Sequence, residues 1–140
     1  MPETMNLHQA PEAMTLHRSL WAGRIMSAFV VIALAADSAV QLFAPARIES
    51  MLQETGFAMD VTHVLGPIIL ACVILYAIPA TAVLGAILVT GFLGGAICAH
   101  VRIGELGSPP ELFSLLLGAM TWGGLYLRDP RIRALLPVIH

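Results

Sequence analysis

The sequence predicts an all-α fold, a four-transmembrane-helix antiparallel bundle, and three observations lead to this prediction. Hydrophobic residues form 58% and charged residues 11% of the 140 residues, whereas soluble chains carry roughly 45–50% and about 25%. Four apolar stretches reach the length of about 17–25 residues that a helix needs to cross a bilayer. Prolines or glycines interrupt the chain between these stretches, as is typical of turns between helices.

The four predicted spans cover residues 20–43, 62–78, 81–101 and 111–127. Pro45 ends the first span, because the residue before a proline is disfavoured in a helix. Only a very tight turn at Pro79 separates the second span from the third, so these two must form an antiparallel hairpin. Asp60 or Thr62 can cap the second span, and Pro67 inside it should kink the helix unless the helix begins later than predicted.

The domain organisation follows from these spans. Residues 1–19 are predicted to be a flexible tail and residues 20–137 a single membrane domain, with Met14 as an alternative start. The small-x-small run at residues 44–46 resembles a signal-peptidase site. The apolar run before it is far longer than the roughly 7–15 apolar residues of a signal peptide, so we expect no cleavage there.

The arginines predict the orientation. All seven positively charged residues are arginines; those on the side of both termini are Arg18, Arg24, Arg128, Arg131 and Arg133, and those opposite are Arg47 and Arg102. Cytoplasmic segments carry the excess of positive charge in membrane proteins. We therefore expect an integral protein of a bacterial inner membrane, surrounded by lipid, with both termini in the cytoplasm.

Several functional classes are disfavoured by composition. A net charge of −2 without a basic stripe argues against nucleic-acid binding. The sequence lacks Cys-x-x-Cys and His-x-x-x-His spacings, so we predict no metal site. Cys72 and Cys98 fall at different depths and are expected to be packed apolar thiols. Because no nucleophile motif, phosphate loop or cofactor fingerprint is recognisable, the sequence favours a non-catalytic protein over an enzyme, and it predicts no particular cofactor.

A stripe of small residues lies on one face of the third span. Gly91, Gly95 and Ala99 are spaced at i, i+4 and i+8, and such stripes allow the close helix contacts that hold membrane bundles together. We expect this stripe to pack against another span of the same chain. Its alternative use is a contact between copies in a homo-oligomer.

Three segments carry a resemblance to a known family. They are residues 37–45, residues 81–102 with their Gly-Gly-Ala and His-x-Arg elements, and residues 122–131. Together they resemble the DoxX-like family of small four-helix integral membrane proteins, over residues 20–137. Some relatives are tied to sulfur oxidation, quinone-linked redox complexes or oxidative-stress assemblies. The resemblance therefore implies a membrane or peripheral redox protein as partner, and a quinone as cofactor by resemblance alone. Relatives often carry Lys where this chain has Gln41.

Six polar residues should converge at the outer end of the bundle, because adjacent spans alternate in direction. These residues are Asp37, Gln41, His63, His100, Arg102 and Glu111. Asp37 precedes the end of its span by six residues, which places it about 9 Å inside that end. An unpaired ionisable group at that depth costs on the order of 2–3 kcal/mol or more, so we expect Asp37 to contact His100 or Arg102.

Asp37 has two competing interpretations, an interhelical polar clasp and a substrate or proton site. Two function classes follow. The favoured one is a non-catalytic subunit or scaffold of a redox or stress-related membrane complex. The alternative is a binder or isomerase of a small amphipathic or lipid-like ligand, or a quinone, in a pocket at the outer end, with Asp37 and Glu111 as acid and base. A cavity reaching Asp37 favours the ligand, whereas a solid bundle favours the scaffold.

Overall fold

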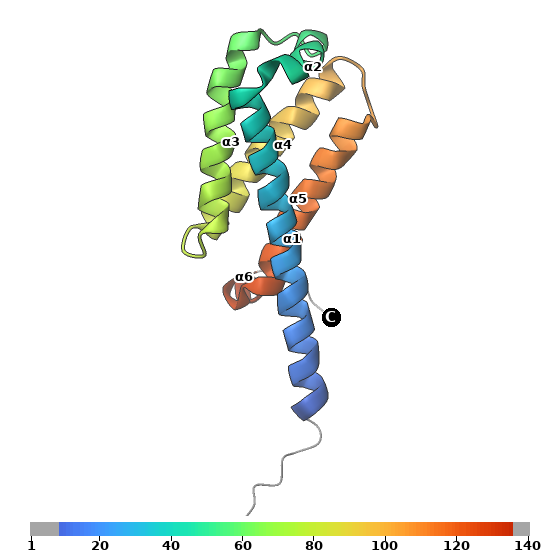
Figure 1. Ribbon diagram of the computed structural model, residues 1–140. Coiled ribbons are helices and arrows are strands. Elements are labelled where there is room, and N and C mark those ends of the chain that lie inside the picture. Colours follow the sequence, from blue (N-terminus) through green and yellow to red (C-terminus); the bar gives the residue numbers. More distant parts are fainter. Residues whose placement is uncertain (1–8, 136–140) are drawn as a thin grey trace, which may run out of the picture.

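A computed structural model describes the backbone of residues 9–135 and the side chains from residue 14 onward. Four long helices dominate these residues (Figure 1): α1 (Gln9–Phe43), α3 (Thr62–Ala77), α4 (Ala82–Arg102) and α5 (Pro109–Arg128). Short helices complete the fold: η1 (Pro45–Ile48), α2 (Glu49–Glu54) and η2 (Met59–Val61) connect α1 to α3, and α6 (Pro130–Leu135) follows α5. The prediction of an all-α protein is confirmed.

The helix boundaries lie close to the predicted ones, with one difference at the start of the chain. α3, α4 and α5 begin and end within two residues of the predicted spans, but α1 begins at Gln9, inside the predicted tail. Local contacts support this extension: the Ser19 hydroxyl donates to the Leu16 carbonyl at 2.8 Å, and the Trp21 indole donates to His17 at 3.2 Å. Residues three and four apart meet on a helix, so these contacts stabilise the first turns of α1.

The expected cap of α3 is absent. No side chain caps α3, because η2 leads directly into it, and the Thr62 hydroxyl instead donates to the Met59 carbonyl at 2.8 Å. Pro67 lies inside α3, which begins at Thr62 as expected. The prediction that Asp60 or Thr62 caps this helix is therefore wrong.

Three helices within the described residues are long and apolar enough to cross a membrane: Met14–Phe43, Met59–Ala77 and Ala82–Arg102. α5 is not among them, since Glu111, two prolines and three glycines lower its hydropathy. Many large apolar side chains on the outside are nevertheless exposed, for example Ile32, Ile87 and Leu116. A soluble protein rarely exposes so much contiguous apolar surface, so this surface is suited to lipid.

The long helices form a closed ring of contacts, in which α1 and α4 each lie against both α3 and α5. The C-terminal ends of α1 and α4 and the N-terminal ends of α3 and α5 gather beside α2 (Figure 1). We call this the α2 end. The turn between α3 and α4, together with α6, lies at the other end, which we call the hairpin end. The N-terminal part of α1 extends beyond the packed helices.

Buried polar groups link the helices. The Ser38 hydroxyl of α1 donates to the Gly66 carbonyl of α3 at 2.8 Å. The Tyr76 hydroxyl of α3 donates to the Thr121 carbonyl of α5 at 2.9 Å and lies 3.1 Å from the Ser27 hydroxyl of α1. Hydrogen bonds of this kind stabilise helix contacts where lipid supplies no hydrophobic driving force.

Close helix contacts occur at glycines other than the predicted ones. A Cβ added at Gly85 would overlap the backbone of Tyr76, and one added at Gly124 would lie 2.7 Å from the Ser27 hydroxyl oxygen. In contrast, a Cβ added at Gly91 or Gly95 meets no heavy atom of the described residues within 4 Å. The prediction that these two glycines pack against another span is thereby corrected: they border open space, and contact with a second copy stays a prediction.

The two kinds of glycine give a test within one helix. Gly85→Ala should destabilise the protein by about 1–3 kcal/mol, because the methyl group enters a contact that is already closed. Gly95→Ala is the matched control and should be neutral or stabilising by up to about 1 kcal/mol, since alanine favours the helix. Thermal unfolding in detergent measures both. Equal losses at the two positions would contradict the assignment of the close contact to Gly85.

Candidate functional site

A partly open cavity of about 490 Å³ lies at the α2 end. Its walls come from α1, α4 and α5 and from residues 48–57 between α1 and α3, with Leu65 of α3. The volume falls within the range of about 300–1,000 Å³ that is typical of small-molecule sites. Most of the lining is apolar, and the polar lining residues are Asp37, Gln41, Thr55, His100 and Ser114.

Small residues on α4 create the space. Gly91, Gly95 and Ala99 line the cavity together with Ala96, and neither glycine has a neighbour within 4 Å of an added Cβ. The stripe that was expected to seal a helix contact therefore forms one wall of the cavity.

The segment between α1 and α3 closes the cavity from the α2 end. Ile48, Met51, Leu52 and Thr55 all line it. The side chain of Arg102 holds this segment, because its guanidinium donates from Nη2 to the Thr55 carbonyl. Gly56 follows with a φ of +74°, a conformation that glycine adopts without strain.

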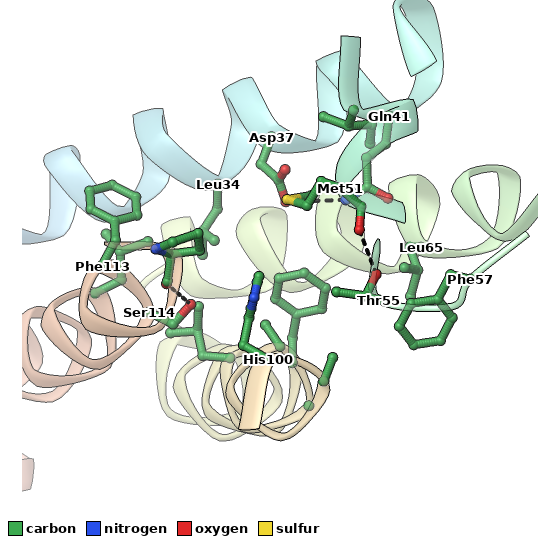
Figure 2. Close-up of a pocket in the computed structure, with 18 of the residues that line it drawn as sticks. Leu34, Asp37, Gln41, Met51, Thr55, Phe57, Leu65, His100, Phe113 and Ser114 are labelled. Carbon is green, nitrogen blue, oxygen red and sulfur yellow. Dashed lines mark hydrogen bonds between the residues drawn. The ribbon is translucent and has the colours of Figure 1, made fainter. Parts of the chain in front are cut away.

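Asp37 and Gln41 form the polar part of the α1 wall (Figure 2). Their side chains lie one helical turn apart, and Gln41 Nε2 donates to Asp37 Oδ2 at 3.2 Å. Gln41 is only 6% exposed, and its Oε1 is buried without a hydrogen-bond partner within the described residues. An unsatisfied buried carbonyl costs about 1–3 kcal/mol. A ligand that donates a hydrogen bond to Gln41 Oε1 would remove this cost.

His100 faces the same cavity from α4 (Figure 2). Its Nδ1 lies 2.8 Å from Oε2 of Glu105, in the loop before α5. A carboxylate partner favours the tautomer with the proton on Nδ1, which leaves Nε2 of a neutral ring as an acceptor. His100 is buried, so the loop contact fixes the ring against the cavity wall.

The two hydroxyl groups in the wall are already occupied as donors. Thr55 donates to the carbonyls of Met51 and Leu52, at 2.8 and 3.1 Å. Ser114 donates to the Pro110 carbonyl at 2.9 Å. Each hydroxyl therefore offers a ligand only the lone pairs of its oxygen.

The structure brings three of the six predicted site residues to the cavity: Asp37, Gln41 and His100. Among the described residues, the hydrogen bond of the Asp37 carboxylate is to Gln41 and not to His100 or Arg102. The expected direct contact across the helices is thus replaced by a shared cavity.

The other three predicted residues lie elsewhere. His63 is exposed at the start of α3. Arg102 is exposed and donates a hydrogen bond to the Thr55 carbonyl. Glu111 is buried, and its Oε2 accepts a hydrogen bond from the Gly107 amide at 2.6 Å, which ties the loop to the first turn of α5. Asp37 and Glu111 therefore do not line one site together.

Sequence reasoning missed the cavity residues between α1 and α3. A signal was present, because Ile48, Met51, Leu52 and Thr55 follow the i, i+3, i+4, i+7 pattern of one helical face. Cys98 is another difference: Cys72 is buried as predicted, whereas Cys98 is exposed on α4, and both thiols are free. Within the residues that the structure describes, no three His, Cys, Asp or Glu side chains are grouped as metal ligands.

These features define an integral membrane protein made of apolar helices, with a cavity at one end. Residues 25–124 match the DoxX-like family. This match covers more than half of the chain, and the chain belongs to the DoxX-like family. Comparisons with curated proteins and with solved structures give no match.

Proposed function

We propose that this DoxX-like protein binds a small amphipathic molecule in the cavity at the α2 end. The observation that carries the proposal is a cavity of about 490 Å³ whose wall is largely apolar but includes Asp37, Gln41 and His100. Such a wall suits a ligand with one polar head and an apolar body. A scaffold role in a redox or stress-related membrane complex needs no such cavity. We therefore favour ligand binding over the scaffold role.

The membrane arrangement belongs to the same proposal. In this arrangement α5 is the fourth span of an antiparallel four-transmembrane-helix bundle. Two observations support this: α5 contacts both α1 and α4, and its side chains Leu112, Leu115 and Leu116 are exposed, like the apolar side chains on the outside of α1 and α4. The arginine distribution favours a bacterial inner membrane with both termini in the cytoplasm. The cavity then opens at the outer end of the bundle.

The polar groups of the wall select the head of the ligand. Asp37 offers carboxylate oxygens and Gln41 has an unsatisfied carbonyl, while Nε2 of His100 is the ring nitrogen that Glu105 leaves free. No described side chain forms an ion pair with Asp37. A head that donates hydrogen bonds, a hydroxyl or an ammonium, complements this wall, while a carboxylate or phosphate would face Asp37 with like charge.

Binding without chemistry is the activity that this arrangement favours. Asp37 and Glu111 do not share the cavity, so the acid and base pair of an isomerase is missing from one site. The heavy atom of a general base must lie within about 2.6–3.2 Å of the heavy atom whose proton it removes. Asp37 is accordingly a group that recognises the ligand.

A series of amphiphiles with the same dodecyl chain tests the choice of head. Dodecylammonium and dodecanol should bind the purified full-length protein more tightly than dodecanoate, measured by native mass spectrometry. Asp37→Asn should weaken dodecylammonium binding roughly tenfold through loss of the charge-assisted contact, and should change dodecanol binding little. Dodecanoate binding as tightly as dodecylammonium would overturn the proposed head chemistry.

Filling the cavity separates binding from folding. Gly95→Leu places a side chain in the open space and should reduce binding of dodecylammonium and dodecanol alike, with little loss of thermal stability. Gly94→Leu is the matched control, because Gly94 also has no neighbour within 4 Å but does not line the cavity. If both variants bind as the unchanged protein does, the cavity is not the binding site.

Cysteine labelling tests the orientation. In a variant with Cys72 and Cys98 replaced by alanine, a cysteine is introduced at exposed Leu106 or at exposed Ala134. In intact bacterial cells a membrane-impermeant maleimide should label Leu106→Cys and spare Ala134→Cys until the cells are lysed. The opposite pattern would place both termini outside.

A further inference from the structure

We propose that the hairpin end carries a second binding site, for the phosphate group of an anionic lipid. A hollow of about 530 Å³ lies there, between α1, the turn joining α3 to α4, and the junction of α5 with α6. Three arginines line it, Arg24, Arg128 and Arg131, and Asp129 is the acidic residue beside them. Its position and its charge distinguish this hollow from the cavity at the α2 end.

The arginines of this hollow have no charged partner in the part of the chain that the structure describes. Among the side chains of residues 14–135, none forms an ion pair with Arg24, Arg128 or Arg131. The Asp129 carboxylate binds the backbone instead: its Oδ1 accepts a hydrogen bond from the Arg131 amide at 2.9 Å, at the start of α6. The hollow thus keeps an excess of positive charge, and guanidinium groups are well suited to phosphate oxygens.

Arg128 is held in place by groups that do not neutralise it. Its Nη2 donates to the Tyr76 carbonyl at 3.1 Å, and its guanidinium carbon lies 5.0 Å from the centre of the Tyr76 ring. Its Nε is buried without a hydrogen-bond partner in the described chain. A cation fixed by a carbonyl and an aromatic ring keeps its charge and loses little further freedom when an anion binds.

The hollow lies at the level where lipid headgroups are expected. α3 ends and α4 begins beside it, and both are long and apolar enough to cross the bilayer. Trp21 lies one turn before Arg24, is half-exposed, and has the Arg24 guanidinium 6.0 Å from its ring centre. Tryptophan at a span end is typical of the membrane–water boundary, and basic pockets there bind anionic headgroups.

This site is independent of the proposed cavity ligand. The two hollows lie at opposite ends of the long helices and share no lining residue. A phosphate in the hairpin hollow would join α1, α5 and α6 through their arginines. Lipid binding should therefore raise the stability of the protein, because a ligand of the folded state shifts the unfolding equilibrium.

Lipid-doped micelles test the site on the full-length protein. Phosphatidylglycerol should raise the Tm above the value measured with phosphatidylcholine, and native mass spectrometry should detect retained phosphatidylglycerol. The double variant Arg24→Gln/Arg131→Gln should bind phosphatidylglycerol roughly thirtyfold more weakly, from the usual contribution of single arginines near anionic lipid. Arg128 is left unchanged because it also holds Tyr76. The matched control is Arg18→Gln/Arg47→Gln, which removes the same charge from exposed positions outside the hollow.

The outcomes separate the sources of the phosphate. A Tm rise with phosphatidylglycerol that is lost in Arg24→Gln/Arg131→Gln and kept in the control supports the lipid site. The same rise with inorganic phosphate alone would support a phosphate site filled from solution and overturn the lipid as its source. No rise with either compound, or an equal rise in both double variants, would overturn the site. None of these results depends on ligand binding at Asp37.

Discussion

The structure depends on close backbone contact between helices, because lipid is as apolar as the side chains and gives helices no hydrophobic reason to associate. Gly23 and Gly124 provide this contact between α1 and α5: a Cβ added at Gly23 would lie 2.9 Å from the Gly124 carbonyl oxygen. Gly85 provides it between α3 and α4, against the backbone of Tyr76. These contacts lie toward the hairpin end, where the Tyr76 hydroxyl also joins α3 to α5. The closest approaches between helix backbones therefore lie toward that end.

The same constraint explains the cavity at the other end. Toward the α2 end α4 still presents small residues, but at Gly91 and Gly95 no helix approaches them. Small residues without a partner leave empty space, and in this protein Met51, Leu52 and Phe57 cover that space from the connecting segment. Arg102 ties this cover to α4 through the Thr55 carbonyl. Glycine thus permits a close helix contact where another helix is near, and it leaves a cavity where no helix is near.

Sequence reasoning succeeded with quantities that depend on position along a helix and failed with those that depend on direction around it. Hydropathy and prolines predict the limits of α3, α4 and α5, and counting residues along the spans predicts that Asp37 and His100 lie toward the same end, where both line the cavity. A membrane helix is apolar on its lipid face and on its packed face, so periodicity does not identify the inner side. For that reason the sequence predicts Gly95 in a helix contact and predicts Arg102 and Glu111 in one polar cluster with Asp37, whereas Arg102 and Glu111 each bind the backbone of a connecting segment.

The distribution of polar groups between the two ends is the last consequence of this architecture. At the α2 end the arginines are exposed, and the cavity wall keeps acceptors: a carboxylate at Asp37 and an unpaired carbonyl at Gln41. At the hairpin end three arginines line the hollow beside the turn, and the carboxylate of Asp129 there accepts a hydrogen bond from a backbone amide. Hydrogen-bond donors and positive charge are thus attracted to one end and anions to the other. The proposed cavity ligand and the proposed lipid phosphate would not compete for space, since the two hollows share no lining residue.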